Sequence, residues 1–133
     1  MLTQYGAIPH RREAGETRIL LVTSRETKRW VIPRGNPIRG LSPAQAAAQE
    51  AFEEAGVTGA MVAEPIGRYN YGKRRRDGSV VPAEVEVYAL EVEVEREEWP
   101  ERHQRERRWF APEEAAAAVD EPGLAALLRS LAH

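Results

Sequence analysis

The chain has 133 residues, of which 42% are hydrophobic and 30% charged, and this length and composition predict a single globular domain over residues 1–133. It contains no cysteine, which excludes a disulfide framework, thiol catalysis and a cysteine-based zinc site, and its formal net charge of −2 gives no general attraction to nucleic acid. No apolar run is long enough to cross a membrane and the first residues lack the core of a signal peptide, so we expect no membrane partner and a cytoplasmic location.

Short strands are predicted in the first third of the chain. Residues 4–9 and 18–23 have the composition of strands, and the second run is apolar enough to be largely buried. A shorter strand is predicted at 29–32 and ends at Pro33. These strands lead into a loop that contains Gly35.

A helix is predicted over about residues 43–55, because both of its ends carry clear signals. Ser42 is a good N-cap, Pro43 suits the first helical position, and Gln45 completes a capping box. Gly56 suits the left-handed residue that often ends a helix.

Three carboxylates share one face of this predicted helix. Glu50, Glu53 and Glu54 fall within about 100° of arc, and small apolar residues occupy the opposite side. Like charges one turn apart cost about 0.2–0.5 kcal/mol per pair. Mg²⁺ reverses that cost, because it prefers oxygen ligands and bridges protein carboxylates to substrate phosphates. The alternative is an ordinary solvated acidic face.

The second half of the chain predicts further strands and two helices. One or two strands are expected within 62–71, and 81–94 shows a strong period-two pattern with a slip between residues 88 and 90. A short strand follows at 107–110, and a helix at about 112–119 opens with acidic residues. Leucines at helical spacing predict an amphipathic final helix: Leu124, Leu127, Leu128 and Leu131.

The segment 35–57, GNPIRGLSPAQAAAQEAFEEAGV, resembles the Nudix box, whose consensus is G-x5-E-x7-R-E-U-x-E-E-x-G-U with U aliphatic. Six positions match in register: Gly35, Glu50, Glu53, Glu54, Gly56 and Val57. Two positions depart, since Leu41 stands in place of a Glu and Gln49 in place of an Arg. Flanking segments extend the resemblance to most of residues 4–131 and are similar to bacterial relatives of the diphosphoinositol polyphosphate phosphohydrolases.

The resemblance implies an α/β fold, the Nudix α/β/α sandwich with a mixed, partly antiparallel sheet between helices. It also implies a pyrophosphohydrolase that uses Mg²⁺, with Mn²⁺ as an alternative. Glu50, Glu53 and Glu54 are then the expected catalytic residues, and the same three carboxylates together with Gly35 are the expected metal ligands. Gln49 is a weaker partner for a neighbouring carboxylate than arginine, because it donates a hydrogen bond without charge.

A basic run after the predicted helix suggests a site for additional phosphates. It consists of Lys73, Arg74, Arg75 and Arg76. Arginine binds phosphate bidentately through its planar fork, and the resemblance adds Arg34 and Arg107 to the candidate substrate contacts. The alternative is a solvated hairpin loop, and we interpret Arg102 and Arg105 as ordinary surface charge.

Three functions remain open from the sequence. The favoured one is Mg²⁺-dependent hydrolysis of a phosphoanhydride bond in a highly phosphorylated small molecule, such as a diphosphoinositol polyphosphate or a dinucleoside polyphosphate. The second is house-cleaning hydrolysis of a nucleotide or nucleotide-sugar diphosphate. The third is a Nudix-fold binding module with weakened catalysis, which the departures at Leu41 and Gln49 would explain. A monomer or a homodimer is expected.

Overall fold

A mixed β-sheet forms the framework of residues 1–132, which the computed structural model describes. The long strands β1 (Leu2–Glu13) and β7 (Val80–Glu95) pair in parallel at its centre, and β2 (Glu16–Thr23) pairs with β1 as an antiparallel hairpin. The remaining strands are shorter: β3 (Trp30–Val31), β4 (Arg34–Gly35), β5 (Val57–Met61), β6 (Gly67–Arg74) and β8 (Arg107–Phe110).

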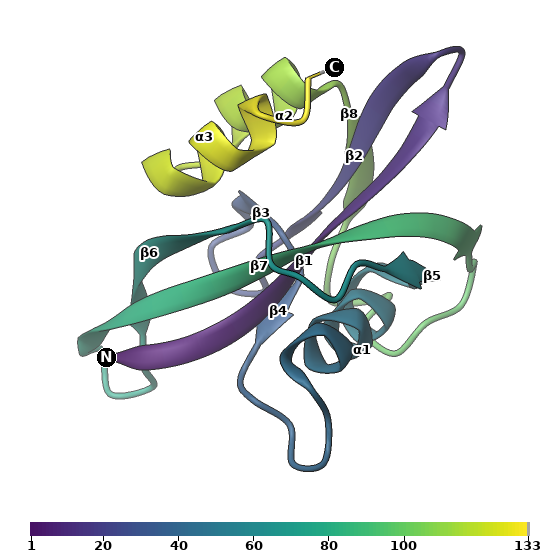
Figure 1. Ribbon diagram of the computed structural model, residues 1–133. Coiled ribbons are helices and arrows are strands. Elements are labelled where there is room, and N and C mark those ends of the chain that lie inside the picture. The colour runs from purple at the N-terminus through teal and green to yellow at the C-terminus, as the bar shows by residue number, and fades with distance from the viewer. Residues whose placement is uncertain (133) are drawn as a thin grey trace.

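Helices cover both faces of this sheet. Helix α1 (Pro43–Ala55) lies against one face, and α2 (Pro112–Ala118) and α3 (Pro122–Arg129) lie against the other (Figure 1). This arrangement confirms the predicted α/β/α architecture with a mixed sheet. No helix within residues 1–132 is long and apolar enough to cross a membrane.

Two hydrophobic cores explain why β2 is a continuous apolar run. Ile19 and Leu21 pack in the core beneath α2 and α3, whereas Leu20 and Val22 pack in the core beneath α1. All four side chains are fully buried. Because successive side chains of a strand point to opposite faces, a strand covered on both faces requires apolar residues at every position.

Helix α1 has the predicted bounds and the predicted caps. The Ser42 hydroxyl accepts a hydrogen bond from the Gln45 amide at 3.2 Å, and the Gln45 side chain accepts one from the Ser42 amide at 2.9 Å. Gly56 ends the helix in the left-handed region with φ of 70°. These contacts are local in sequence, which is why the sequence predicts them well.

The strands after α1 differ from the prediction of one or two strands within 62–71. β5 starts at Val57, immediately after the capping glycine, and ends at Met61, while β6 runs from Gly67 to Arg74. The segment between them contains Pro65, which has no N–H to donate to a neighbouring strand. Lys73 and Arg74 therefore belong to a strand, and the turn that follows β6 holds only the last two cations of the basic run.

The apolar pattern of β7 slips between residues 88 and 90, as predicted, but the strand is not broken there. The pairing of β7 with β1 is continuous from Ala83 to Glu91. Val85 and Val87 face the core beneath α2 and α3, whereas Tyr88 and Leu90 face the core beneath α1. The strand thus keeps its pleat from Ala83 to Glu91, and the face that is covered changes along this length.

Removal of a leucine side chain from the core beneath α3 is expected to destabilise the fold. Leu128→Ala should lower the free energy of unfolding by about 2–5 kcal/mol, because Leu128 is fully buried and the substitution leaves a cavity. Leu41→Ala, at a leucine that is 40% exposed, should change it by less than about 0.5 kcal/mol. Urea unfolding of both variants provides the measurement, and equal losses would contradict this core assignment.

Candidate active site

A cavity of about 730 Å³ opens beside the N-terminal edge of β4 and the inner face of α1. Its walls come from many parts of the chain, which include β4, α1, β6, the β2–β3 loop and the segment between β7 and β8. Six acidic and six basic side chains line it. Such a mixture suits a ligand that carries negative charge together with a cation.

Two of the predicted carboxylates, Glu50 and Glu54, line this cavity from successive turns of α1. Glu54 is only 6% exposed. The Glu50 carboxylate lies so close to Gly35 that a Cβ on residue 35 would collide with it. Residue 35 must therefore lack a Cβ because the Glu50 side chain approaches its backbone closely, and this requirement does not depend on the backbone conformation.

Burial and repulsion from neighbouring carboxylates raise the pKa values of both carboxyls. Burial raises the pKa of Glu50 to about 7, and the charges of Glu53 and Glu101 act in the same direction. Burial raises the pKa of Glu54 to about 8, with further increases from Glu50 and Glu101, while Arg105 opposes them. A cation close to these carboxyls would favour their ionised form, because opposite charge lowers the pKa of a carboxyl.

Arg105 supplies part of that positive charge, and its interpretation as surface charge is wrong. Its side chain is only 10% exposed and lies 3.7 Å from a Glu54 oxygen. It donates hydrogen bonds to the Glu101 carboxylate at 2.7 Å and to the Thr23 carbonyl at 3.0 Å. Glu101 and Arg105 both line the cavity. No local pattern places them there, because their position depends on how residues 96–107 fold back onto α1.

Glu53, the third predicted carboxylate, does not line the cavity. It accepts a hydrogen bond of 2.7 Å from the Gln49 amide, one turn earlier on α1. Gln49 and Leu41, the two departures from the Nudix consensus, line one apolar hollow of about 400 Å³ beside the helix. The two changed positions are thus neighbours in space, as expected if one substitution follows from the other.

The donor set beside Gly35 fits a hard divalent cation with water in its coordination shell. Within residues 1–132, no three histidine, cysteine or acidic side chains are grouped closely enough to hold a metal alone. Glu50 and Glu54 nevertheless both line one cavity, and the Glu50 carboxylate lies where a Cβ on Gly35 would have no room. Mg²⁺ is commonly bound through one or two carboxylates, waters and substrate phosphates, so a three-residue cage is not required.

The predicted substrate contacts divide into two groups. Arg34, Lys73 and Arg74 line the cavity, whereas Arg75 and Arg76 do not. The Arg75 carbonyl accepts a hydrogen bond from the Gly78 amide, which closes the turn after β6. Two further cations in the β2–β3 loop, which sequence reasoning missed, also line the cavity: Arg25 and Arg29.

Arg34 is held firmly at the cavity wall. One guanidinium nitrogen donates hydrogen bonds to the Tyr69 hydroxyl at 2.8 Å and to the Glu121 carboxylate at 2.9 Å. The guanidinium also lies 3.8 Å from the centre of the Tyr71 ring. Glu121 immediately precedes α3, so the final helix contributes directly to this wall.

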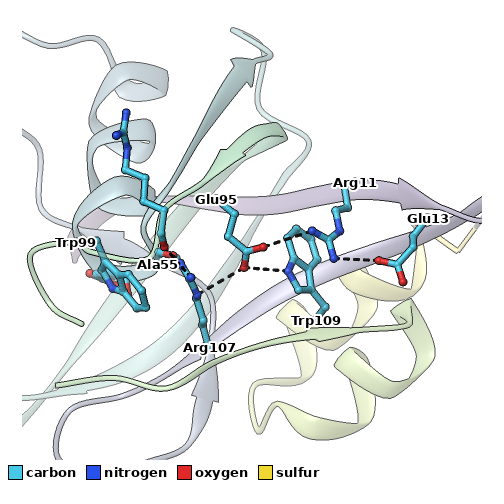
Figure 2. A network of polar contacts seen from close by, with 9 residues as sticks. Arg11, Glu13, Ala55, Glu95, Trp99, Arg107 and Trp109 are labelled. Carbon is cyan, nitrogen blue, oxygen red and sulfur yellow. Dashed lines mark hydrogen bonds and ion pairs between the residues drawn. The ribbon is translucent and has the colours of Figure 1, made fainter. Parts of the chain in front are cut away.

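Arg107 does not line the cavity, although the resemblance makes it a candidate substrate contact. Its guanidinium donates to the carbonyls of Ala55 at 2.8 Å and Arg96 at 2.7 Å, and lies over the ring of Trp99 (Figure 2). These carbonyl contacts direct it to the C-terminal end of α1 and away from the cavity.

Comparison with known proteins identifies the family. The NUDIX domain model matches residues 4–131, so the chain belongs to the Nudix family. Nudix hydrolase 4 of Arabidopsis thaliana is 33% identical over 118 residues, which cover 83% of this chain and 55% of that protein. Diphosphoinositol polyphosphate phosphohydrolase 3-beta of Bos taurus is 34% identical over 107 residues, which cover 78% of this chain and 61% of the relative. The chain thus spans between half and two-thirds of the length of these two relatives.

Solved structures share this fold over nearly the whole chain. Ap4A hydrolase of C. elegans has a TM-score of 0.67 and 22% sequence identity, covering 97% of this chain and 94% of that one. The E. coli dihydroneopterin triphosphate pyrophosphohydrolase has a TM-score of 0.71 at 14% identity, covering 98% and 94%. At these identities the likeness establishes the fold.

Without divalent cations, the free energy of unfolding is expected to fall as the pH rises from about 4.5 to about 8. The folded pKa of Glu54 is about 8 and its ordinary value is 4.5, so over this interval the folded state retains a proton that the unfolded chain has lost. Each unit of pKa difference between the folded and unfolded states corresponds to about 1.4 kcal/mol, so the free energy of unfolding should fall by a few kcal/mol. Urea unfolding in the presence of a chelator measures it.

Glu54→Gln should reduce this pH dependence, because the amide cannot ionise, while the contribution of Glu50 remains. The exposed Glu98, whose side chain is 80% exposed, provides the matched control. Glu98→Gln should leave the dependence unchanged. A Glu54→Gln variant with the same slope as the unmodified chain would contradict the assigned environment of this carboxyl.

Proposed function

We propose that the chain is a metal-dependent hydrolase of a phosphoanhydride bond in a highly phosphorylated small molecule. The observation that carries this proposal is a cavity in which Arg105 only partly offsets the carboxylates of α1 and further cations surround them. A diphosphate with additional phosphates, together with Mg²⁺ or Mn²⁺, satisfies both charges at once.

The carboxylates have distinct roles in this proposal. Glu50 and Glu54, with the backbone of Gly35, would hold the cation, and Glu53 would support them from outside the cavity through its bond with Gln49. Bound metal supplies charge neutralisation for the phosphates and lowers the pKa of an attacking water.

Five cations form the proposed phosphate clamp, defined as Arg25, Arg29, Arg34, Lys73 and Arg74. All five line the cavity. The relative from Bos taurus is named a diphosphoinositol polyphosphate phosphohydrolase and the C. elegans structure an Ap4A hydrolase, and both names describe substrates with several phosphates. The proposal therefore favours diphosphoinositol polyphosphates and dinucleoside polyphosphates as substrates.

A nucleotide or nucleotide-sugar diphosphate is the second candidate, and one observation favours it. Uncharged polar groups line the same cavity beside the cations: Gln4, Asn36, Asn70 and Tyr71. The Tyr71 hydroxyl donates to the Gln4 side chain at 2.5 Å, and the Gln4 amide donates to Asn36 at 3.3 Å. Such groups suit a base or a ribose, and the Shewanella oneidensis NrtR Nudix domain is described as complexed with ADP ribose.

Location and oligomeric state stay predictions. Relatives include proteins named mitochondrial and chloroplastic. The expected cytoplasmic location and the expected monomer or homodimer therefore need direct measurement, by fractionation of the source cells and by sedimentation.

Charge reversal within the phosphate clamp should separate the two substrate classes. Arg74→Glu is expected to lower kcat/KM for a diphosphoinositol polyphosphate by at least about tenfold, since a hydrogen bond to a charged group contributes about 1.5–3 kcal/mol. The loss for ADP-ribose should be much smaller. Arg75→Glu is the matched control, because Arg75 belongs to the same basic run but does not line the cavity. Equal losses on both substrates would argue against the clamp.

Removal of the Glu53 carboxylate tests whether the chain is an enzyme or a binding module. A panel of diphosphate substrates with Mg²⁺ or Mn²⁺, read by phosphate release, should show turnover by the unmodified chain. Glu53→Gln should lower that turnover by about 100-fold, as loss of a group that supports metal ligands typically does, without unfolding the chain. Glu98→Gln should retain full turnover. Substrate binding without any phosphate release by the unmodified chain would favour the binding module.

A further inference from the structure

The C-terminal end of α1 is enclosed by the segment that connects β7 to β8. An α-helix leaves its last four carbonyls without partners inside the helix. Here each of them accepts a hydrogen bond: Phe52 from the Gly56 amide at 3.0 Å, Glu53 from the Glu101 amide at 3.0 Å, Glu54 from the Trp99 indole at 3.2 Å, and Ala55 from Arg107 at 2.8 Å. Three of these four donors come from residues 99–107, so a distant segment completes the helix.

We propose that Trp99 and Arg107 are positioning residues of the reaction, which fix the carboxylate end of α1 against the segment that carries Glu101 and Arg105. We call Trp99, the Glu101 amide and Arg107 the end cap of α1. The proposal rests on the proposed function for its catalytic consequence. It assigns Arg107 a role through the helix, in place of the substrate contact that the resemblance implies.

The contacts of Arg107 leave little freedom for this end of the helix. Its guanidinium lies 3.8 Å from the centre of the Trp99 ring and donates to two carbonyls, one on α1 and one at Arg96. A planar fork that donates in two directions while it stacks on a ring cannot be replaced by an ammonium group. A cation beside the last carbonyls of a helix also interacts favourably with the helix dipole.

Gly56 is shaped to receive the end cap. A Cβ there would lie 2.7 Å from the Trp99 ring and 2.8 Å from an Arg107 nitrogen. The Gly56 carbonyl in turn accepts a hydrogen bond of 2.8 Å from the Arg96 amide. The glycine thus permits close approach of the end cap in addition to its left-handed conformation.

The end cap is anchored to the sheet through Glu95, the last residue of β7. The Glu95 carboxylate lies 3.5 Å from Arg107, accepts a hydrogen bond from the Trp109 indole at 3.1 Å, and pairs with Arg11 at 3.4 Å (Figure 2). Three strands, β1, β7 and β8, therefore hold Arg107 in place. This frame links the rigid sheet to the turn of α1 that carries Glu54.

The position of the end cap explains how it reaches the chemistry. Trp99 bonds the backbone of Glu54, and two residues further the Glu101 amide bonds the backbone of Glu53. The Glu101 carboxylate accepts a hydrogen bond from Arg105, whose guanidinium also lies near the Glu54 carboxylate. A shift of Trp99 or Arg107 would move these groups relative to one another without any direct contact between the end cap and a substrate.

Arg107→Ala tests this role, with Arg108→Ala as the matched control. Arg108 is a neighbour on β8, but it is exposed and lies over the rings of Trp30 and Phe110 instead of the helix. Arg107→Ala should weaken Mn²⁺ affinity by about tenfold, lower kcat by about 10- to 100-fold and change KM little, with equal effects on polyphosphate and ADP-ribose substrates. Arg108→Ala should match the unmodified chain. Mn²⁺ binding by calorimetry and steady-state kinetics give the values.

Amide hydrogen exchange without metal provides a readout that does not depend on activity. Exchange at residues 53–56 should be about tenfold faster in Arg107→Ala than in Arg108→Ala, because an unsupported helix end opens locally. Trp99→Phe should change exchange and Mn²⁺ affinity in the same direction by less, since it removes the indole donor but keeps the ring; it also serves if Arg107→Ala does not fold.

The outcomes separate this proposal from the proposed function. Unchanged exchange in Arg107→Ala would overturn the positioning role, whatever its activity. A loss confined to polyphosphate substrates, with normal Mn²⁺ affinity, would also overturn it and make Arg107 a substrate contact. If the unmodified chain hydrolyses nothing, the proposed function fails, and the exchange experiment still decides whether the end cap fixes α1.

Discussion

Burial of Glu50 and Glu54 in one cavity, among other acidic side chains, is the constraint on which the rest of the structure depends. Ionised carboxyls in such a place are costly, and burial raises both pKa values toward neutrality. The fold opposes this cost with the Arg105 guanidinium and with a backbone hydrogen bond from Arg34. These contacts leave the charge incompletely balanced, as the proposed binding of a cation together with its ligand requires.

The same constraint accounts for the neighbours of the carboxylates. Glycine at position 35 lets the Glu50 carboxylate approach the backbone, and alanines on the opposite side of α1 let the helix lie close to the sheet. The end cap of α1 prevents the last turn from moving away under repulsion. The carboxylates of α1 and the hydrogen bonds at its C-terminal end therefore act together to fix the position of the helix.

Sequence patterns predicted the parts of the site that are local. Helix α1, its caps and the spacing of its carboxylates follow from residues within one or two turns of each other, and the structure has the same bounds. The sequence did not reveal that Arg105 is buried, because its partners Thr23 and Glu54 lie far away in the chain. The basic run likewise seemed uniform, yet only Lys73 and Arg74 line the cavity, since pairing with β7 fixes which residues β6 contains.

In the proposed function, the bond between Arg34 and Glu121 makes the C-terminal helices part of ligand recognition. Glu121 takes up half of the hydrogen-bonding capacity of one guanidinium nitrogen, and its place at the start of α3 depends on the packing of buried leucines such as Leu124 and Leu128. Divergence within residues 120–130 could thus retune which ligand is accepted while the carboxylate helix stays unchanged. In the proposed function, α1 carries the carboxylates and the start of α3 holds Arg34, so two helices on opposite faces of one sheet contribute to the same cavity.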